Sequence, residues 1–261
     1  MEGAPDRPRN PLPTRVTDLP ELDPGYVHVL DEGLAAMGLE LPPDVRQAID
    51  DHVRLLLAWT TAINLTAIRE PAEVARLHVL DSLAAVRPLR ARGVTGLLDI
   101  GSGGGFPGLP LAAGLGARRA LLVDSVGKKV RFLQTVIEAT GRTGRAHAEN
   151  ARVEALAHDA RDREQWPAVT ARAVTSLAEL VELGLPLVAP GGVLVAWKRG
   201  PLGEELAAAE GALRALNAGP VTIVEAGVPG LDDHRLVLVE RGGPIDPVFP
   251  RDPAERRRRP L

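Results

Sequence analysis

The sequence predicts an α/β protein in which a Rossmann-like, mostly parallel sheet follows a helical region. Apolar residues recur at helical spacing before residue 90. Between residues 91 and 241, short apolar strands alternate with helical stretches, which is typical of a parallel sheet with helices on both faces. A glycine-rich loop directly follows the first strand, where open α/β sheets bind ligands.

The chain divides into four predicted regions. Its 261 residues are enough for one large domain and a small appendage. Proline and arginine are frequent at both ends, so we expect a flexible tail over residues 1–25 and a basic segment over residues 242–261. Between them we expect the helical region over residues 26–90 and the Rossmann-like domain over residues 91–241.

The composition excludes several kinds of site. The chain has no cysteine, which excludes disulfides, thiolate metal sites and cysteine nucleophiles, and we expect no metal. The first residues lack the apolar core of a signal peptide, and no apolar run reaches the roughly 20 residues of a membrane helix. We therefore expect a cytoplasmic protein without membrane contact. Nearly all its positive charge is arginine, which suits phosphate recognition and equally fits the coding bias of a GC-rich genome.

The helical region should contain about three helices. In residues 44–62, Val45, Ile49, Val53 and Leu56 recur at helical spacing. Another helix is expected over residues 71–86, with a proline in its first turn.

The strands and helices of the main domain follow in alternation. Strands are expected at residues 96–100, 120–124, 145–149, 168–173 and 193–197, and helices at residues 127–139, 177–187 and 204–216. Two further strands, at residues 221–226 and 234–240, are joined by a short loop that has no room for a crossover helix. This last pair should be antiparallel, which makes the sheet the methyltransferase variant of the doubly wound fold.

The loop from Asp99 to Phe106 is the first candidate site. Gly101, Gly103 and Gly105 permit positive φ and allow close approach of a ligand to the backbone. A plain turn is the alternative, but a run of three glycines is more than a turn needs. Together with Gly108, two of these glycines also fit the dinucleotide pattern G-x-G-x-x-G, which is weak alone.

Two acids bear on the choice of ligand. The carboxylate of Asp99, just before the loop, suits the cationic ammonium end of S-adenosylmethionine and would repel a pyrophosphate. Asp124 ends the second strand, and an acid about 20 residues after the glycines is placed to bind ribose hydroxyls. Both nucleotide classes share the second device, so Asp99 favours S-adenosylmethionine over a nicotinamide cofactor.

Several motifs in a fixed order are more specific than the loop. The segments LLDIGSGGGFPGLPLA, LLVDSVGKKVRFLQ, ARAVTSLAEL and APGGVLVAWKRG resemble the bacterial 16S ribosomal RNA guanine-N7 methyltransferases, the RsmG or glucose-inhibited division protein B family. INLTAIRE, HVLDSL and FPRDPAERRRRPL extend the resemblance over most of the chain after residue 50. It implies the class I S-adenosylmethionine-dependent methyltransferase fold, and methylation of N7 of a specific guanine in small-subunit ribosomal RNA.

The resemblance also implies which residues contact S-adenosyl-L-methionine. They lie in the glycine loop, after the third strand and at the end of the fourth: Gly101, Phe106, Val153, Glu154 and Arg172. Asp124 and Ser125 would lie on the adenosine side. Trp197 and Arg199 depart from the common family pattern without putting the activity in doubt.

The expected chemistry needs no catalytic side chain. Guanine N7 has a free lone pair and no proton to remove, so alignment and exclusion of water are sufficient. The chain also lacks the cysteine of pyrimidine C5 methyltransferases and the Asn/Asp-Pro-Pro-aromatic motif of enzymes that methylate exocyclic amines.

Basic side chains should then hold RNA phosphates, in 16S ribosomal RNA or the 30S subunit, with the protein as a monomer. The candidates are Arg69, His78, Lys128, Lys129, Arg131, Lys198, Arg251 and Arg257. His78 shares a helix face with Asp81 and Ser82, either as a solvated or capping cluster or, as the resemblance favours, facing the cofactor. Alone, the final arginines indicate a disordered tail, whereas the resemblance implies an ordered closing segment.

Two other functions remain as alternatives. A small-molecule methyltransferase of the same fold would not need the helical region or the arginine-rich end. A non-catalytic RNA-binding module with a degenerate fold would not need Asp99, the glycine loop and Asp124 intact.

Overall fold

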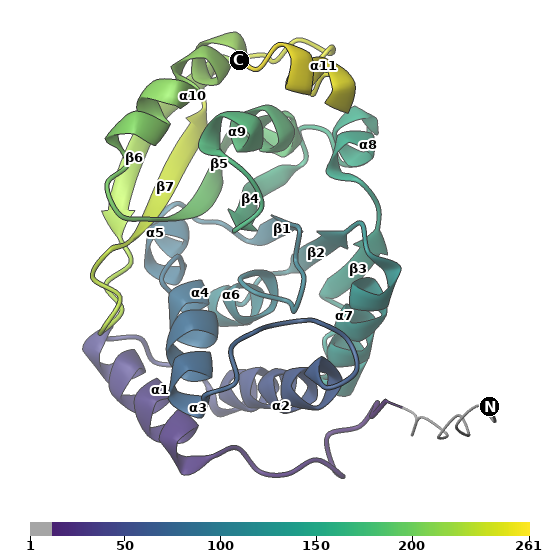
Figure 1. The fold of residues 1–261 in the computed structure, drawn as a ribbon, viewed down its shortest axis with the longest axis vertical. Coiled ribbons are helices and arrows are strands. Elements are labelled where there is room, and N and C mark those ends of the chain that lie inside the picture. Colours follow the sequence, from purple (N-terminus) through teal and green to yellow (C-terminus); the bar gives the residue numbers. More distant parts are fainter. Residues whose placement is uncertain (1–11) are drawn as a thin grey trace, which may run out of the picture.

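The computed structural model describes residues 12–261, and its centre is a seven-stranded sheet of order β3-β2-β1-β4-β5-β7-β6 (Figure 1). The strands are β1 (Gly96–Ile100), β2 (Arg119–Asp124), β3 (Ala146–Asn150), β4 (Trp166–Arg172), β5 (Val188–Arg199), β6 (Ala218–Glu225) and β7 (His234–Arg241). Strands β1 to β5 pair in parallel, and β7 lies antiparallel between β5 and β6. The predicted class I methyltransferase fold, with its antiparallel last strand, is confirmed.

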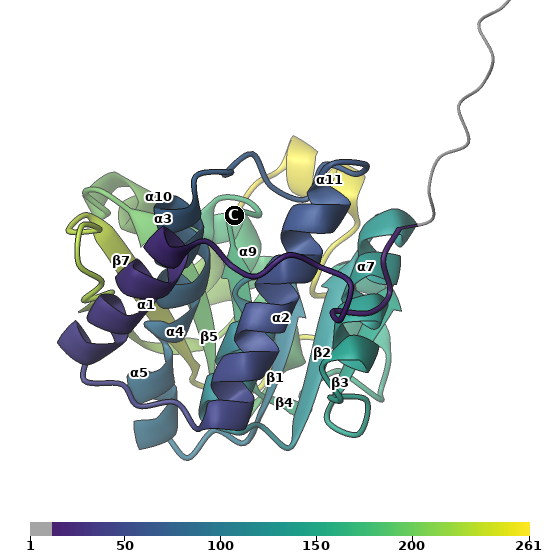
Figure 2. The same ribbon diagram turned by 90° about the horizontal axis from the view of Figure 1, so that it is seen from below.

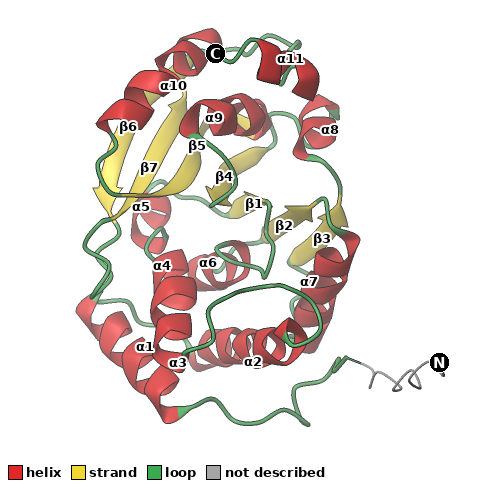
Figure 3. Ribbon diagram, viewed as in Figure 1, coloured by secondary structure: helices red, strands yellow, loops and turns green. Residues whose placement is uncertain are grey.

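Helices cover both faces of the sheet (Figure 3). One face carries α1 (Pro24–Ala36), α2 (Pro43–Thr60), α3 (Pro71–Glu73), the π-helix η1 (Val74–Leu80), α4 (Asp81–Leu83), α5 (Val86–Ala91), α6 (Gly108–Leu115) and α7 (Gly127–Ala139). The other carries α8 (Val153–His158), α9 (Leu177–Gly184), the 3-10 helix η2 (Leu185–Leu187), α10 (Gly203–Ala215) and α11 (Pro253–Arg258). Each face has its own apolar core, so all five residues of β1 are buried. Among residues 12–261, no helix has the length and apolar character needed to cross a bilayer.

The N-terminal segment differs from the flexible tail predicted over residues 1–25. Residues 1–11 of that prediction lie outside the described residues. Residues 12–23 run across α2 (Figure 2), where Trp59 Nε1 donates to the Pro13 carbonyl at 2.7 Å and Arg54 Nε to the Pro20 carbonyl at 2.8 Å. Leu12 and Val16 pack on the same core. The many prolines suggested a tail because sequence periodicity cannot show that an extended segment lies along a helix.

The helix predicted over residues 71–86 contains an irregularity that the sequence pattern does not show. Its middle, η1, is a π-helix, and such turns are frequent at functional sites. The wider turn shifts the side chains after Leu80 relative to a regular helix, and Asp81 follows directly.

Candidate functional site

A cleft opens at the carboxyl ends of the parallel strands, as the fold predicts. It has a volume of about 340 Å³, within the range of ligand sites, and its walls are the loops after β1, β2, β3 and β4. We call it the first cleft. Five predicted cofactor residues line it: Gly101, Asp124, Ser125, Val153 and Glu154.

The carboxylate of Asp124 joins two of these loops. Its Oδ2 accepts from the backbone N–H of Gly103 at 3.0 Å, and its Oδ1 accepts from that of Val126 at 2.8 Å. Lys129 Nζ lies 3.8 Å from Oδ2 and balances the charge. The Asp124 side chain therefore fixes the shape of the glycine loop while it lines the cleft.

Glycine is required in the loop because the backbone turns through left-handed conformations. The φ angles of Gly101 and Gly103 are 66° and 54°, which other residues rarely adopt. A Cβ at Gly101 would also lie 2.9 Å from a methyl group of Val174, which lines the same cleft. The absent side chain of Gly101 therefore allows the loop to pack closely against Val174.

Asp99 does not lie where the sequence analysis places it. Its side chain is fully buried beneath the loop and does not line the cleft. Thr170 Oγ1 donates to Asp99 Oδ1 at 2.7 Å, while Oδ2 has no hydrogen-bond partner among the described residues. Burial raises the pKa of Asp99 to about 6. The position before the glycine loop predicts a ligand contact, but β1 is covered on both faces, and the Asp99 side chain points into the core.

Phe106 also points away from the first cleft. Its ring is stacked between the imidazoles of His52 and His78, with centroids 4.4 Å and 4.8 Å apart. His52 Nε2 bonds the Gly104 carbonyl at 2.7 Å, and a Cβ on Gly105 would lie 2.9 Å from the His52 ring. Burial lowers the pKa of His52 to about 4 and that of His78 to about 3. Gly105 and the Phe106 ring thus attach the loop to the helical region.

A second cleft of about 480 Å³ adjoins the first, and both are lined by Ala173. It lies between the helical region and strands β4, β5 and β7. Its lining includes eight polar or aromatic residues: His78, Asp81, Arg172, Thr175, Trp197, Lys198, Arg199 and His234. Arg172, which the resemblance implies is a cofactor contact, lines this second cleft beside Ala173.

Asp81 forms hydrogen bonds with three other residues in the wall of the second cleft. Its carboxylate accepts from Arg172 Nη1 at 2.7 Å and lies 2.8 Å from His234 Nδ1, and its carbonyl accepts from Trp197 Nε1 at 2.8 Å. Burial alone would raise the pKa of Asp81, but the hydrogen bonds from His234 and Arg172 hold it below its usual value. Of its predicted companions, His78 also faces the cleft, whereas Ser82 is buried and donates to the His78 carbonyl.

The predicted RNA-binding side chains fall into two groups. Arg251 is bound to Glu182, with Nε and Nη2 at 2.8 Å and 2.7 Å from its oxygens, and this buried pair is not available to phosphate. Lys198 lines the second cleft but donates to Glu205 at 2.6 Å. Exposed side chains without an ion pair or hydrogen bond to the rest of residues 12–261 are Arg69, Lys128, Arg131 and Arg257.

Two arginines at the clefts were not predicted. Arg152 lines the first cleft and Arg199 the second, and both are exposed. Arg152 directly precedes the predicted Val153, and Arg199 directly follows the predicted Lys198. This proximity in sequence is the signal by which they could have been found.

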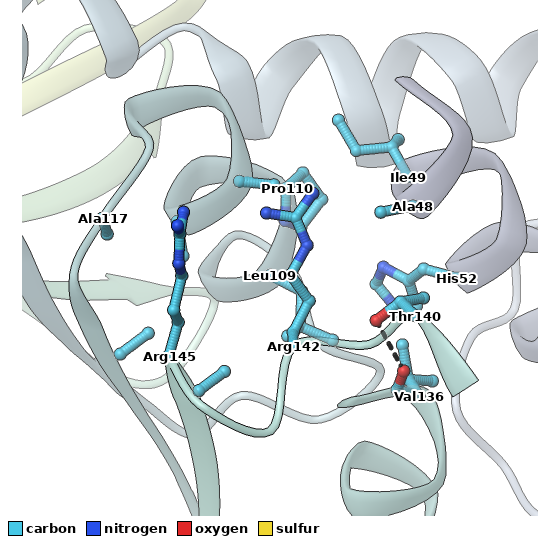
Figure 4. Close-up of a pocket in the computed structure, with 14 residues that line it drawn as sticks. Ala48, Ile49, His52, Leu109, Pro110, Ala117, Val136, Thr140, Arg142 and Arg145 are labelled. Atoms are coloured by element: carbon cyan, nitrogen blue, oxygen red, sulfur yellow. Dashed lines mark hydrogen bonds between the residues drawn. The ribbon is translucent and has the colours of Figure 1, made fainter. Parts of the chain in front are cut away.

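A further cavity lies away from these clefts, between α2, α6 and α7 (Figure 4). Alanines and aliphatic side chains such as Ile49 and Leu109 form most of its wall, and its volume is about 30 Å³. This is comparable to a single water molecule and too small for a nucleoside.

Solved structures support the fold. An O-methyltransferase from Bacillus cereus in complex with SAH superposes with a TM-score of 0.53 at 15% identity, over 81% of this chain and 96% of that one. A SAM-dependent O-methyltransferase from Thermotoga maritima has a TM-score of 0.50 at 12% identity, over 73% and 72%. At such low identity the likeness concerns the fold alone.

Sequence relatives are more specific. The family model for rRNA small subunit methyltransferase G, GidB, matches residues 45–234. A ribosomal RNA small subunit methyltransferase G from Chloroflexus aggregans is 36% identical over 89% of this chain and 97% of its own length. One from Rubrobacter xylanophilus is 38% identical over 87% and 88%. The chain therefore belongs to the GidB family of ribosomal RNA small subunit methyltransferases G.

Proposed function

We propose that the protein transfers a methyl group from S-adenosylmethionine to N7 of a guanine in 16S ribosomal RNA. The observation that carries this proposal is the pair of adjoining clefts that share Ala173, because a donor and an acceptor must meet at one point. Membership of the family supports ribosomal RNA as the substrate.

The first cleft fits S-adenosylmethionine. Asp124 and Glu154 supply oxygen acceptors for hydroxyl and amino groups, and Gly101 lies in the same wall. When bound, the cofactor supplies a methyl group on a cationic sulfur. Ser125 and Val153 complete the proposed wall, and Arg172 lines the second cleft next to the shared Ala173.

The second cleft would hold the guanine. The residues around it align the base and exclude water, and none is needed as a base because N7 carries no proton. The lowered pKa of His78 keeps its imidazole neutral, and Asp81 balances the charge of Arg172. Both features limit the repulsion of the cationic methylated guanine.

Exposed basic side chains around the clefts would hold the RNA backbone. Arg199 lines the second cleft, and Arg69, Lys128 and Arg131 are exposed on neighbouring elements. Arginine suits bidentate phosphate contacts. We propose that the protein acts in the cytoplasm as a monomer on ribosomal RNA or the 30S subunit.

The decisive experiment offers the purified protein two acceptors, naked 16S ribosomal RNA and 30S subunits, with a sample without RNA as the control. Labelled S-adenosylmethionine is the donor, and mass spectrometry of the digested nucleosides identifies the product. We expect 7-methylguanosine in one or both RNA samples. Cofactor binding without labelled RNA would favour a small-molecule methyltransferase, and RNA binding without cofactor binding would favour a non-catalytic module.

A further inference from the structure

In the closing segment, residues 249–261, the buried arginines and the Phe249 carbonyl bond other parts of the protein. Arg163 Nη1 donates to the Phe249 carbonyl at 2.7 Å, and Arg251 pairs with Glu182 on α9. Arg256 in α11 is also buried, with 8% of its side chain exposed. A tail that gripped RNA through these arginines would leave them free, so their partners point to another role.

The partner of Arg256 lies at the first cleft. Arg256 Nη2 donates to Glu154 Oε1 at 2.7 Å, and Nε lies 3.6 Å from a Glu179 oxygen. Glu154 belongs to the wall of the cleft, and its side chain is 18% exposed. A contact between residues 102 positions apart therefore connects the closing segment with the proposed cofactor site.

We propose that Arg256 is a positioning residue for the cofactor, because it holds the Glu154 carboxylate on the wall of the first cleft. Without the guanidinium, this half-buried carboxylate would lose its hydrogen-bond partner and could turn away from the ligand. The hydrogen bond from Arg256 also keeps the pKa of Glu154 below its usual value, against the effect of burial, so the group stays ionised. The proposal rests on the first cleft being the cofactor site.

The chain offers two matched controls. Arg251 anchors the same segment through Glu182, which does not line the first cleft, so Arg251→Gln tests anchoring alone. Arg258 lies in α11 with Arg256 but is exposed, and within residues 12–261 its side chain bonds only the Ala254 carbonyl, so Arg258→Gln tests the loss of one charge.

The experiment measures binding of S-adenosylhomocysteine by calorimetry in the absence of RNA, with thermal unfolding of each variant. We expect Arg256→Gln to weaken binding about tenfold, the scale of a lost charged hydrogen bond. Arg258→Gln should leave the dissociation constant unchanged. Arg251→Gln should lower the unfolding temperature but weaken binding much less than Arg256→Gln does. In a Glu154→Gln background, Arg256→Gln should have little further effect on affinity.

Three results would overturn the inference. One is equal weakening by Arg251→Gln and Arg256→Gln, which would mean that only the order of the segment matters. Another is an Arg256→Gln effect that persists in full beside Glu154→Gln. The third is wild-type affinity in Arg256→Gln or, if that variant does not fold, wild-type affinity in Glu154→Gln. Failure of the wild-type chain itself to bind would instead contradict the proposed function, and the inference with it.

Discussion

Some side chains at this site stabilise the surrounding loops as well as line the proposed ligand site. Asp124 is the clearest case, because both its oxygens already accept backbone N–H groups, from Gly103 and Val126. A carboxylate oxygen has more than one lone pair, so these bonds leave capacity for a ribose hydroxyl. The sequence predicts an acid at this position. It does not predict the hydrogen bonds of Asp124 to the loop backbone, because these depend on the conformation of the turn.

The substitution Asp124→Ala should weaken cofactor binding by about 1–3 kcal/mol, the cost of removing a charged hydrogen-bond partner. Calorimetric titration with S-adenosylhomocysteine measures it. Asp232→Ala, an exposed acid outside both clefts, serves as the control. An unaltered dissociation constant in the Asp124 variant would show that the carboxylate plays no part in the site.

Asp99 should make stability depend on pH. Its folded-state pKa of about 6 is above the ordinary value of 3.8, so the folded protein holds this proton more tightly. The protonated Asp99 carboxyl group contributes its full stabilisation of the folded state at pH values below 3.8. This contribution is lost as the pH rises through about 6. Relative to Asp99→Asn, the wild type should lose on the order of 2–3 kcal/mol of unfolding free energy over this window.

Urea unfolding of both proteins across this window gives the measurement. His52 and His78, whose pKa values are lowered, lose stabilising effect as the pH falls, in the opposite direction. Both proteins contain them, so they cancel in the difference. A constant difference at every pH would contradict the raised pKa of the buried Asp99 carboxyl group.

At the scale of elements, periodicity predicted what is regular and missed what depends on distant contacts. Helix α2 and strands β1 and β2 lie close to their predicted ranges, because their apolar patterns match a single buried face or a fully buried strand. The π-helix η1 and the short helices α8 and α11 were not predicted. Their positions are set by partners elsewhere in the chain, such as Glu154 for Arg256.

The same limit applies to the candidate site. Gly101, Asp124, Ser125, Val153 and Glu154 follow strand ends, and strand ends meet at one edge of a parallel sheet, so these positions gathered as predicted. Phe106 lies in the same loop, but its ring packs on His52, a contact between helix and loop that no spacing shows.

Truncation after Gly243 should lower methyl transfer itself and not only RNA affinity. It removes Phe249 and Leu261 from the apolar core on the sheet face that carries α8 to α11, and it removes Arg256 from Glu154. Misplacement by about 1 Å can cost roughly a hundredfold in rate. Single-turnover methylation of 30S subunits, with enzyme and cofactor saturating, tests this. Circular dichroism controls for folding, and a full-length rate in the truncated protein would make the segment a tether.

The whole molecule has a net charge of −3, so RNA binding must depend on local groups of basic side chains. Exposed residues such as Arg69, Lys128 and Arg199 should release counterions from phosphates, and affinity for 30S subunits should fall steeply with salt. Affinity for S-adenosylhomocysteine should change little. Parallel titrations over a salt series measure both, and equal salt slopes would contradict two separate sites.

The contacts of Asp81 also have a consequence for synthesis on the ribosome. This buried carboxylate belongs to the first part of the chain to emerge, yet its partner His234 follows 153 residues later. Domains form as the chain is made, at about 5–20 residues per second. For several seconds a nascent chain therefore holds the Asp81 carboxylate without its His234 partner. The cleft proposed for the guanine is completed only after β7 has left the exit tunnel, so an incomplete product of translation lacks it.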